Sequence, residues 1–229
     1  MVKERKEMKR IGVIAIDGPA GAGKSTVARD LARRLGIRYL DTGAIYRAVA
    51  LWLDGRGVPP CESPALRKAL NDVTVRLENG RVEVNDADVT DKIRTPRVSD
   101  LASSYSALPS VRERLLALQR EQALAGPLVA DGRDMGTVVF PLAPLKIFLT
   151  ASCDERANRR WKELKERGDA PSLEEMKASL ARRDDQDEHR ELSPLRPAPE
   201  AWELDSSNMT VEQVVEAVLR RLLGDEYAG

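Results

Sequence analysis

Residues 18–26 (GPAGAGKST) have the spacing of the phosphate-binding loop GxxxxGK[ST]. An apolar run over 11–16 precedes them, and a helical pattern over 27–35 follows them. A buried strand, a glycine-rich turn and a helix N-terminus in this order aim backbone N–H groups and a positive dipole end at one anion. The spacing therefore predicts a nucleoside triphosphate site.

Two oxygen groups of the sequence are candidates for Mg²⁺. Ser25 follows Lys24, and these two side chains are expected on the metal and on the β- and γ-phosphates, respectively. Asp131 ends the apolar run 128–130, where a phosphate-transferring enzyme carries its second Mg²⁺ group, usually acting through water. A plain Asp-Gly turn is the alternative at this point. The loop residues expected to contact ATP are Gly18, Pro19, Ala20, Gly21, Ala22, Gly23, Lys24, Ser25 and Thr26.

Several arginines outside the loop are candidates for anion binding. Arg47 lies just over one turn into a helix that Asp41 or Thr42 can cap and that runs through Leu53. Arg112 lies in the first turn of a helix over 110–124, where a cation opposes the helix dipole. Solvation on a helix surface is the alternative for both side chains.

Ser110 and Glu113 have capping-box spacing and predict the start of this last helix. Arg133 and Asp134 follow the strand that ends at Asp131. They therefore lie at the carboxyl end of a parallel strand, where doubly wound sheets bind ligands.

Two charge-rich helices are predicted near the C-terminus. Ser152 caps the first, which runs to about residue 167 and carries Arg156, Arg159 and Arg160. Ser172 and Glu175 form a capping box for the second. With the loop between them, the pair could fold over a triphosphate as a lid, or it could simply present a solvated face.

The second charge-rich helix ends in a stripe of Arg183, Asp187 and Arg190, spaced i, i+4 and i+7. The stripe is either a salt-bridge row or a pair of guanidinium forks and a carboxylate for a sugar phosphate.

The strand pattern predicts an α/β fold with about five parallel strands wrapped by helices. Short apolar strands are expected at 11–16, 37–40, 128–130, 145–149 and 202–205. Ser63 and Pro64 predict the start of a short helix, and Thr210 with Gln213 predicts the cap of a terminal amphipathic helix. Alternating residues over 73–78 and 81–84, joined by Asn79 and Gly80, predict a small antiparallel hairpin inserted into the parallel core.

Composition excludes several classes of protein. Among 229 residues, 37 Lys and Arg balance 37 Asp and Glu, so no net field favours nucleic acid or a membrane. Cys61 and Cys153 lack the spacing of a disulfide framework or a zinc site. The sequence contains neither an apolar stretch near the ~18 residues of a membrane span nor a signal peptide. We expect a cytoplasmic monomer.

The arginines outnumber what one triphosphate needs: Arg47, Arg112, Arg133, Arg183 and Arg190. Phosphoryl transfer between two anions uses such a surplus, because catalysis is mostly positioning and charge neutralisation. No His/Asp pair stands ready as a strong base, and an anionic phosphate acceptor requires none.

Together with the loop, four segments resemble the bacterial cytidylate kinase family. They are 39–47 (YLDTGAIYR), 93–96 (IRTP), 131–141 (DGRDMGTVVFP) and 183–190 (RDDQDEHR), and the resemblance covers about 11–222. It implies a P-loop kinase that transfers the γ-phosphate of ATP to CMP or dCMP with Mg²⁺. It further implies one domain over 1–229, with a core (11–62, 110–155, 190–229), an NMP-binding insertion at about 63–109 and a lid at about 156–172.

The resemblance also assigns roles to individual residues. It implies Thr42, Arg47, Arg133 and Arg190 at the CMP phosphate, Ser103, Arg112 and Asp134 at cytosine, and Arg183 and Asp187 at the sugar. It implies Arg156, Arg159 and Arg160 in the lid and Ser206 beside adenine. The residues expected to be catalytic are Lys24, Asp131, Arg133 and Arg159.

Cytosine has an N4 donor and the acceptors N3 and O2, which match a carboxylate on Asp134 and donors on Arg112 and Ser103. CMP is therefore expected over UMP. The alternatives are an adenylate- or shikimate-type kinase with another acceptor and a GTPase-type switch. The switch is disfavoured because no Asn-Lys-x-Asp motif occurs. A nucleic-acid role is disfavoured by zero net charge and 4% aromatic residues.

Overall fold

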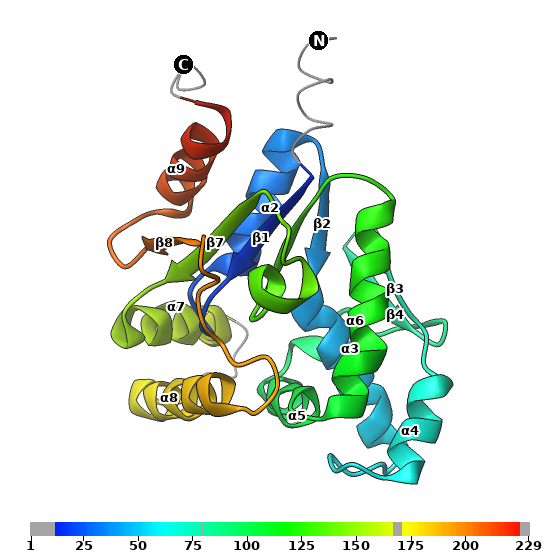
Figure 1. The fold of residues 1–229 in the computed structure, drawn as a ribbon. Helices are drawn as coiled ribbons and strands as arrows, with labels where there is room; N and C mark the ends of the chain where they lie inside the picture. The colour runs from blue at the N-terminus through cyan, green and yellow to red at the C-terminus, as the bar shows by residue number, and fades with distance from the viewer. Residues whose placement is uncertain (1–11, 79, 167–170, 225–229) are drawn as a thin grey trace. The chain divides into compact units, whose positions relative to one another are not determined.

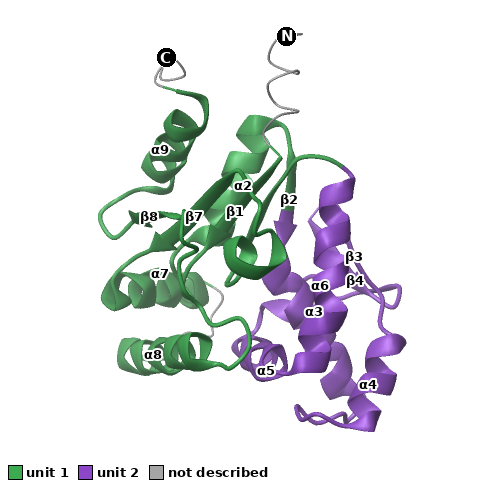
Figure 2. Ribbon diagram, viewed as in Figure 1, with its two compact units in different colours: residues 1–39, 126–229 green, residues 40–125 purple. Residues whose placement is uncertain are grey.

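The computed structural model describes residues 12–78, 80–166 and 171–224. The chain divides into two compact units (Figure 2). Unit 1 comprises Met1–Tyr39 and Gly126–Gly229, and unit 2 comprises Leu40–Ala125. Each unit is described by itself below.

Unit 1 is built on a five-stranded sheet, as predicted (Figure 1). Its strand order is β2-β6-β1-β7-β8, and β1 pairs in parallel with β6 and β7, as β7 does with β8. The strands are β1 Val13–Asp17, β2 Arg38–Asp41, β6 Leu128–Gly132, β7 Leu145–Thr150 and β8 Trp202–Asp205. The central position of β1 places its carboxyl end, where the phosphate-binding loop begins, between two neighbouring strands.

Four helices surround this sheet within unit 1. They are α2 Lys24–Leu35, α7 Cys153–Glu166, α8 Leu173–His189 and α9 Val211–Leu223. The helices α2 and α9 and the sheet share one core that includes the fully buried Ile14, Leu31 and Val215. The helices α7 and α8 lie side by side (Figure 1) over a second cluster that includes Ala157 and Leu180.

The predicted helix starts in unit 1 are confirmed where the signal is local. The Ser152 hydroxyl accepts the Glu155 N–H, and both Ser172 with Glu175 and Thr210 with Gln213 form complete capping boxes. Such a box satisfies two unpaired N–H donors with residues three positions apart, so spacing alone identifies it. Part of the predicted lid, residues 167–170, lies outside the described residues.

Unit 2 consists of four helices and a small antiparallel sheet. The helices are α3 Thr42–Gly55, α4 Pro64–Asn71, α5 Pro96–Ser106 and α6 Pro109–Leu124, with a short 3₁₀ turn, η1, at Lys92–Arg94. The sheet contains β3 Val75–Glu78, β4 Arg81–Val84 and β5 Ala87–Asp88. The hairpin prediction is confirmed, with Leu77 opposite Val82, whereas its turn residue Asn79 lies outside the described residues.

The predicted cap at Ser110 is wrong. Helix α6 already begins at Pro109, which suits the first helical position because it lacks an N–H and has a fixed φ. Ser110 instead binds Glu62, 48 positions earlier, with its backbone N–H at 2.9 Å and its hydroxyl at 2.6 Å from the carboxylate. Spacing within the helix could not reveal this partner.

Helix α5 was not predicted, because Thr95 and Pro96 are typical of the end of an inserted segment as well as of a helix start. They are the N-cap and the first residue of α5, and the Thr95 hydroxyl accepts the Val98 N–H. The compact unit that holds the hairpin runs over Leu40–Ala125, and the insertion at about 63–109 stays a prediction. Helices α3 and α6 pack with α5, which joins them to the same core.

Candidate active site

The phosphate-binding loop follows β1 and leads directly into α2. Gly23, with φ +87°, is the N-cap of α2, and its carbonyl accepts the N–H groups of Thr26 and Val27. Gly18 has no room for a side chain, because a Cβ there would lie 2.0 Å from the Leu149 carbonyl oxygen of β7. Close packing against the neighbouring strand therefore requires glycine at the start of the loop.

Lys24 lies beneath the loop, with its Nζ donating to the Pro19 carbonyl at 2.7 Å. Its pKa lies well below its ordinary value, first because burial disfavours the charged form and then because Arg133 adds a second positive charge nearby. The loop backbone thus holds the ammonium in place, and a polyphosphate beside it would favour its charged form.

Ser25 and Asp131, the two predicted metal groups, are joined directly. The Ser25 hydroxyl donates to Asp131 Oδ2 at 2.8 Å, and the Tyr39 hydroxyl donates to Oδ1 at 2.8 Å. In the described part of the chain no group of three or more His, Cys, Asp or Glu could hold a metal by itself. A hydroxyl and one carboxylate suit Mg²⁺, which prefers oxygen ligands and takes its remaining ligands from phosphate and water. No motif indicates that Tyr39 lies beside this carboxylate, and its contact with Asp131 was not predicted.

Arg133 and Asp187 form a short ion pair at the centre of the arginine group of unit 1. Arg133 Nε donates to Asp187 Oδ2 at 2.7 Å, and Arg190 Nη1 lies 3.7 Å from Asp187 Oδ1. Burial by itself would raise the pKa of Asp187, but the charges of Arg133 and Arg183 outweigh it and hold the pKa below its ordinary value. Asp187 is therefore an anion that keeps cations together.

The predicted stripe of Arg183, Asp187 and Arg190 is not wholly helical. Arg183 and Asp187 belong to α8, which ends at His189, whereas Arg190 follows it in extended conformation. Arg190 Nε donates to the Ser193 carbonyl at 2.7 Å, within the segment that follows α8. The side chains of Asp187 and Arg190 approach each other across this change of direction.

The three arginines of α7 have different surroundings. Arg156 is buried, and its guanidinium donates to the Ala20 carbonyl at 3.0 Å and to Asp184 at 2.7 Å. Arg159 donates to the Ser206 carbonyl at 2.6 Å and hydroxyl at 3.1 Å, whereas Arg160 pairs with Glu163 on its own helix. Arg156 thus ties the loop to α8, and the ATP contact predicted for it stays a prediction.

Unit 2 holds four of the predicted site residues on three helices. Thr42 is the first residue of α3 and is buried. Arg47, one turn further, approaches the carboxylate of Asp41 at 3.4 Å, while that carboxylate caps α3 by accepting the Ala44 N–H at 2.7 Å. Among the described residues Arg47 Nε has no hydrogen-bond partner.

The remaining two lie on α5 and α6. Ser103 of α5 is largely buried. Arg112 of α6 donates to the Ser106 carbonyl at 3.1 Å, and its guanidinium lies 5.8 Å from the centre of the Tyr46 ring. The partners of the Arg112 guanidinium thus include a backbone carbonyl and an aromatic ring.

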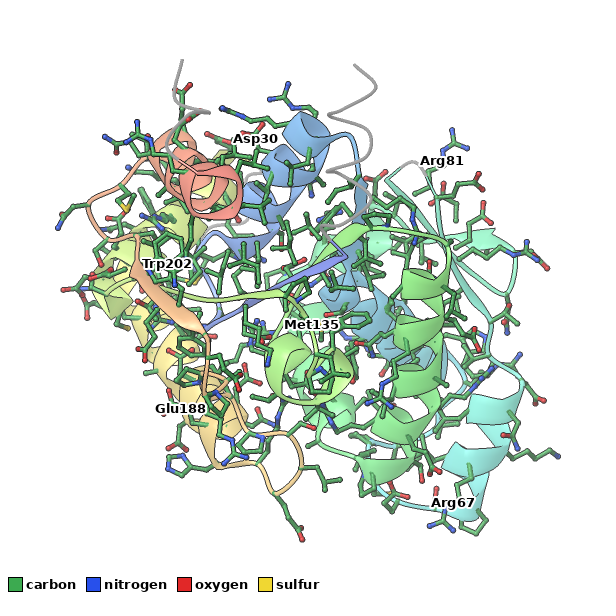
Figure 3. All side chains as sticks on the ribbon, turned by 45° about the horizontal axis from the view of Figure 1, so that its top comes forward. Asp30, Arg67, Arg81, Met135, Glu188 and Trp202 are labelled. Atoms are coloured by element: carbon green, nitrogen blue, oxygen red, sulfur yellow. The ribbon has the colours of Figure 1, made fainter. Side chains whose placement is uncertain are left out.

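Asp134 lies in unit 1 at the end of β6 and is 3% exposed. It precedes a π-helical turn, Met135–Val139, whose first residue is labelled in Figure 3. Asp17, which the motif analysis did not select, binds the start of this turn. The other residues of unit 1 that are predicted to contact CMP are Arg133, Arg183, Asp187 and Arg190.

No helix in the described ranges is both long and apolar enough to cross a membrane.

The fold and the loop define a P-loop kinase. A shikimate kinase from Acinetobacter baumannii, solved with shikimate, shares this fold at a TM-score of 0.50 and 14% identity, over 96% of this chain and 98% of that chain. Within this class, a family model described as Cytidylate kinase matches residues 14–223. The chain belongs to the cytidylate kinase family.

Individual relatives agree with this assignment. A cytidylate kinase from Thermotoga neapolitana is 47% identical over 209 residues, 90% of this chain and 94% of that protein. One from Geobacter sulfurreducens is 48% identical over 208 residues, 89% of each. A bifunctional pantoate ligase/cytidylate kinase from Prochlorococcus marinus is 46% identical over 218 residues, which span 93% of this chain and 42% of the relative.

Proposed function

We propose that this protein transfers the γ-phosphate of ATP to CMP and dCMP, giving CDP and dCDP. The observation that carries the proposal is the phosphate-binding loop, where the loop backbone holds the Lys24 ammonium at 2.7 Å and the next residue, Ser25, donates to Asp131 at 2.8 Å. Family membership supports the same reaction, since the relatives above are named cytidylate kinases.

The donor side of the proposal rests on the loop. Its backbone N–H groups and Lys24 would bind the phosphates of ATP, and Ser25 and Asp131 would hold Mg²⁺. At these two residues the ion would supply positive charge to the phosphates of ATP. Arg159 and Ser206, which bind each other, are proposed at the transferring group and at adenine, respectively.

The acceptor side needs cations rather than a base. The phosphate of CMP is already anionic, so its oxygen can attack without losing a proton to the protein. Arg133 and Arg190 in unit 1 and Arg47 and Thr42 in unit 2 are proposed to bind this phosphate. Neutralising charge on the transferring group is the main way in which proteins accelerate this reaction.

Base selection is proposed for Asp134, Arg112 and Ser103. A carboxylate accepts from N4 of cytosine, whereas uracil would present its O4 to that carboxylate and leave buried polar groups unpaired. Arg183 and Asp187 are proposed at the sugar. A preference for CMP over UMP follows from the hydrogen-bond pattern of the base.

A coupled assay that follows ADP release tests the proposal with CMP, dCMP, UMP, AMP, GMP and shikimate as acceptors. We expect turnover of CMP and dCMP and weak turnover of the rest. Equal turnover of UMP would contradict the base assignment, and preference for AMP or shikimate would support the alternative kinases. Slow GTP hydrolysis without any acceptor would support a nucleotide-dependent switch.

A monomeric state and a cytoplasmic location stay predictions from the sequence. Light scattering of the purified protein tests the first of them.

A further inference from the structure

Asp17, the last residue of β1, binds a distant segment of backbone with both carboxylate oxygens. Oδ1 accepts the Met135 N–H and Oδ2 accepts the Gly136 N–H, each at 2.7 Å. The side chain is 4% exposed, and the residue directly precedes Gly18 of the phosphate-binding loop. One carboxylate thus joins the start of the donor loop to the start of the π-helical turn Met135–Val139.

This turn would ordinarily be capped by the residue before it. That residue is Asp134, and aspartate is a favoured N-cap because its carboxylate can accept the first unpaired N–H groups of a helix. In the described structure the Asp134 side chain makes no such bond. Asp17 accepts these N–H groups instead. Of the two buried aspartates, Asp17 therefore caps the turn, and the Asp134 carboxylate does not.

Holding Asp17 charged in this place opposes stability. The pKa of Asp17 is raised to about 6: burial, the largest cause, and the nearby charge of Asp134 raise it, and the two backbone N–H groups and Lys24 lower it by less. From β7, Lys146 packs its alkyl chain against Gly136 and pairs its ammonium with Glu200. A buried ion with such a cost is expected where geometry matters more than stability.

We propose that Asp17 is a positioning residue for acceptor recognition: by binding the backbone of Met135 and Gly136 it holds Asp134 in place at the end of β6. The inference rests on the proposed function, because it gives Asp134 a nucleobase to select. It predicts that a residue adjoining the ATP loop in sequence acts mainly on the other substrate.

Asp17→Asn tests this role by steady-state kinetics with each substrate varied in turn. An amide oxygen can accept only one of the two N–H groups, and its NH₂ faces the other. We expect the KM for CMP to rise about 10-fold, as for loss of one buried hydrogen bond. The CMP/UMP ratio of kcat/KM should fall, and the KM for ATP should change less than about twofold. Asp30→Asn, on the surface of α2, is the matched control and should leave all these values unchanged.

A double variant separates positioning from a general structural role. If Asp17 acts through Asp134, adding Asp17→Asn to Asp134→Asn should lower the CMP/UMP ratio no further, so the two effects are not additive. Equal rises in both KM values, additive effects, or no effect of Asp17→Asn would contradict the proposal. A wild-type protein that phosphorylates no CMP would instead contradict the proposed function.

A measurement on the wild-type protein keeps the test open if Asp17→Asn does not fold. In ¹⁵N–¹H spectra at a fixed pH of about 7.5, where Asp17 is ionised, the amides of Met135 and Gly136 report on their bonds to its carboxylate. CMP added without ATP should shift both resonances. Resonances that CMP leaves unmoved, in protein that phosphorylates CMP, would overturn the proposal.

Discussion

The candidate site residues of the two units are held in different ways. In unit 1, Arg133 and Arg156 each form a partly buried ion pair of 2.7 Å, and Asp131 accepts two hydroxyl groups at 2.8 Å. In unit 2, Arg47 approaches the carboxylate of Asp41 only at 3.4 Å, and within the described residues its Nε has no hydrogen-bond partner. Short charge-assisted bonds fix a side chain more firmly than long or neutral ones.

The difference distinguishes side chains that are fixed before a ligand binds from side chains that can adapt to the ligand. Side chains that are fixed before the ligand arrives need no rearrangement during phosphoryl transfer, which is the condition for electrostatic catalysis. Arginines with weak partners have less to give up when a phosphate replaces those partners. We infer that the Arg133 guanidinium is fixed before an acceptor binds, whereas that of Arg47 gains hydrogen-bond partners when the acceptor binds.

The largest effect is expected for Lys24→Ala. Loss of the ammonium that the loop holds should lower kcat about 10³-fold, as for removal of one preorganised group at the transferring charge. The KM for CMP should change little. The coupled assay measures both values, and Lys177→Ala, which removes a surface lysine of α8, is the control. A kcat within tenfold of the wild-type value would show that activity does not depend on the Lys24 ammonium of unit 1.

Arg133→Ala and Arg47→Ala compare the two units directly. Both should lower activity with CMP, but Arg133→Ala should also lower the free energy of unfolding by about 3 kcal/mol, because Asp187 stays buried without its shortest partner. Arg47→Ala should cost at most about 1 kcal/mol, since its pair with Asp41 is long. Urea unfolding measures both. Equal losses of stability would remove the contrast between the units.

Stability should fall with rising pH because of Asp17. Its folded-state pKa of about 6 exceeds the ordinary value of 3.8, so the folded protein binds the proton more tightly. The contribution to stability is complete below about pH 4 and is lost as the pH rises through 6, by up to about 3 kcal/mol. Urea unfolding from pH 4 to 7 measures it relative to Asp17→Asn. An unchanged difference between the two proteins would contradict the raised pKa.

Asp134→Asn tests whether a residue of unit 1 also recognises the base of the acceptor. The amide would present a donor or a poorer acceptor to N4 of cytosine, so the preference for CMP over UMP should fall about 30-fold, or about 2 kcal/mol. ATP binding, measured by titration calorimetry with a non-hydrolysable analogue, should be unaffected. Equal losses for both nucleotides would indicate a structural role.

The smallest effect is expected for Ser63→Ala in unit 2. The Ser63 hydroxyl accepts the Leu66 N–H at the start of α4, and loss of such a cap costs about 1 kcal/mol. Urea unfolding should detect the change, while kcat and both KM values stay at wild-type levels. Altered KM for CMP would show that the acceptor residues of unit 2 depend on α4.

Signals that depend on nearby residues were predicted well. The caps at Ser63, Ser152, Ser172 and Thr210 and the strand that precedes the phosphate-binding loop follow from local hydrogen bonding and periodicity. The predicted cap at Ser110 failed because its partner, Glu62, is remote in sequence. Helix α5 was missed because Thr95 and Pro96 suit a hairpin end as well as a helix start.

The sequence by itself determined the donor loop, the strands of the parallel sheet and the family. These depend on the spacing of residues within a few turns or strands. Only the tertiary structure decided which carboxylate holds each arginine, that Arg156 binds the loop carbonyl, and that Asp17 rather than Asp134 caps the turn at Met135. Asp17 and Met135 are 118 positions apart, and parallel pairing of β1 with β6 brings them together, a contact that local spacing does not encode.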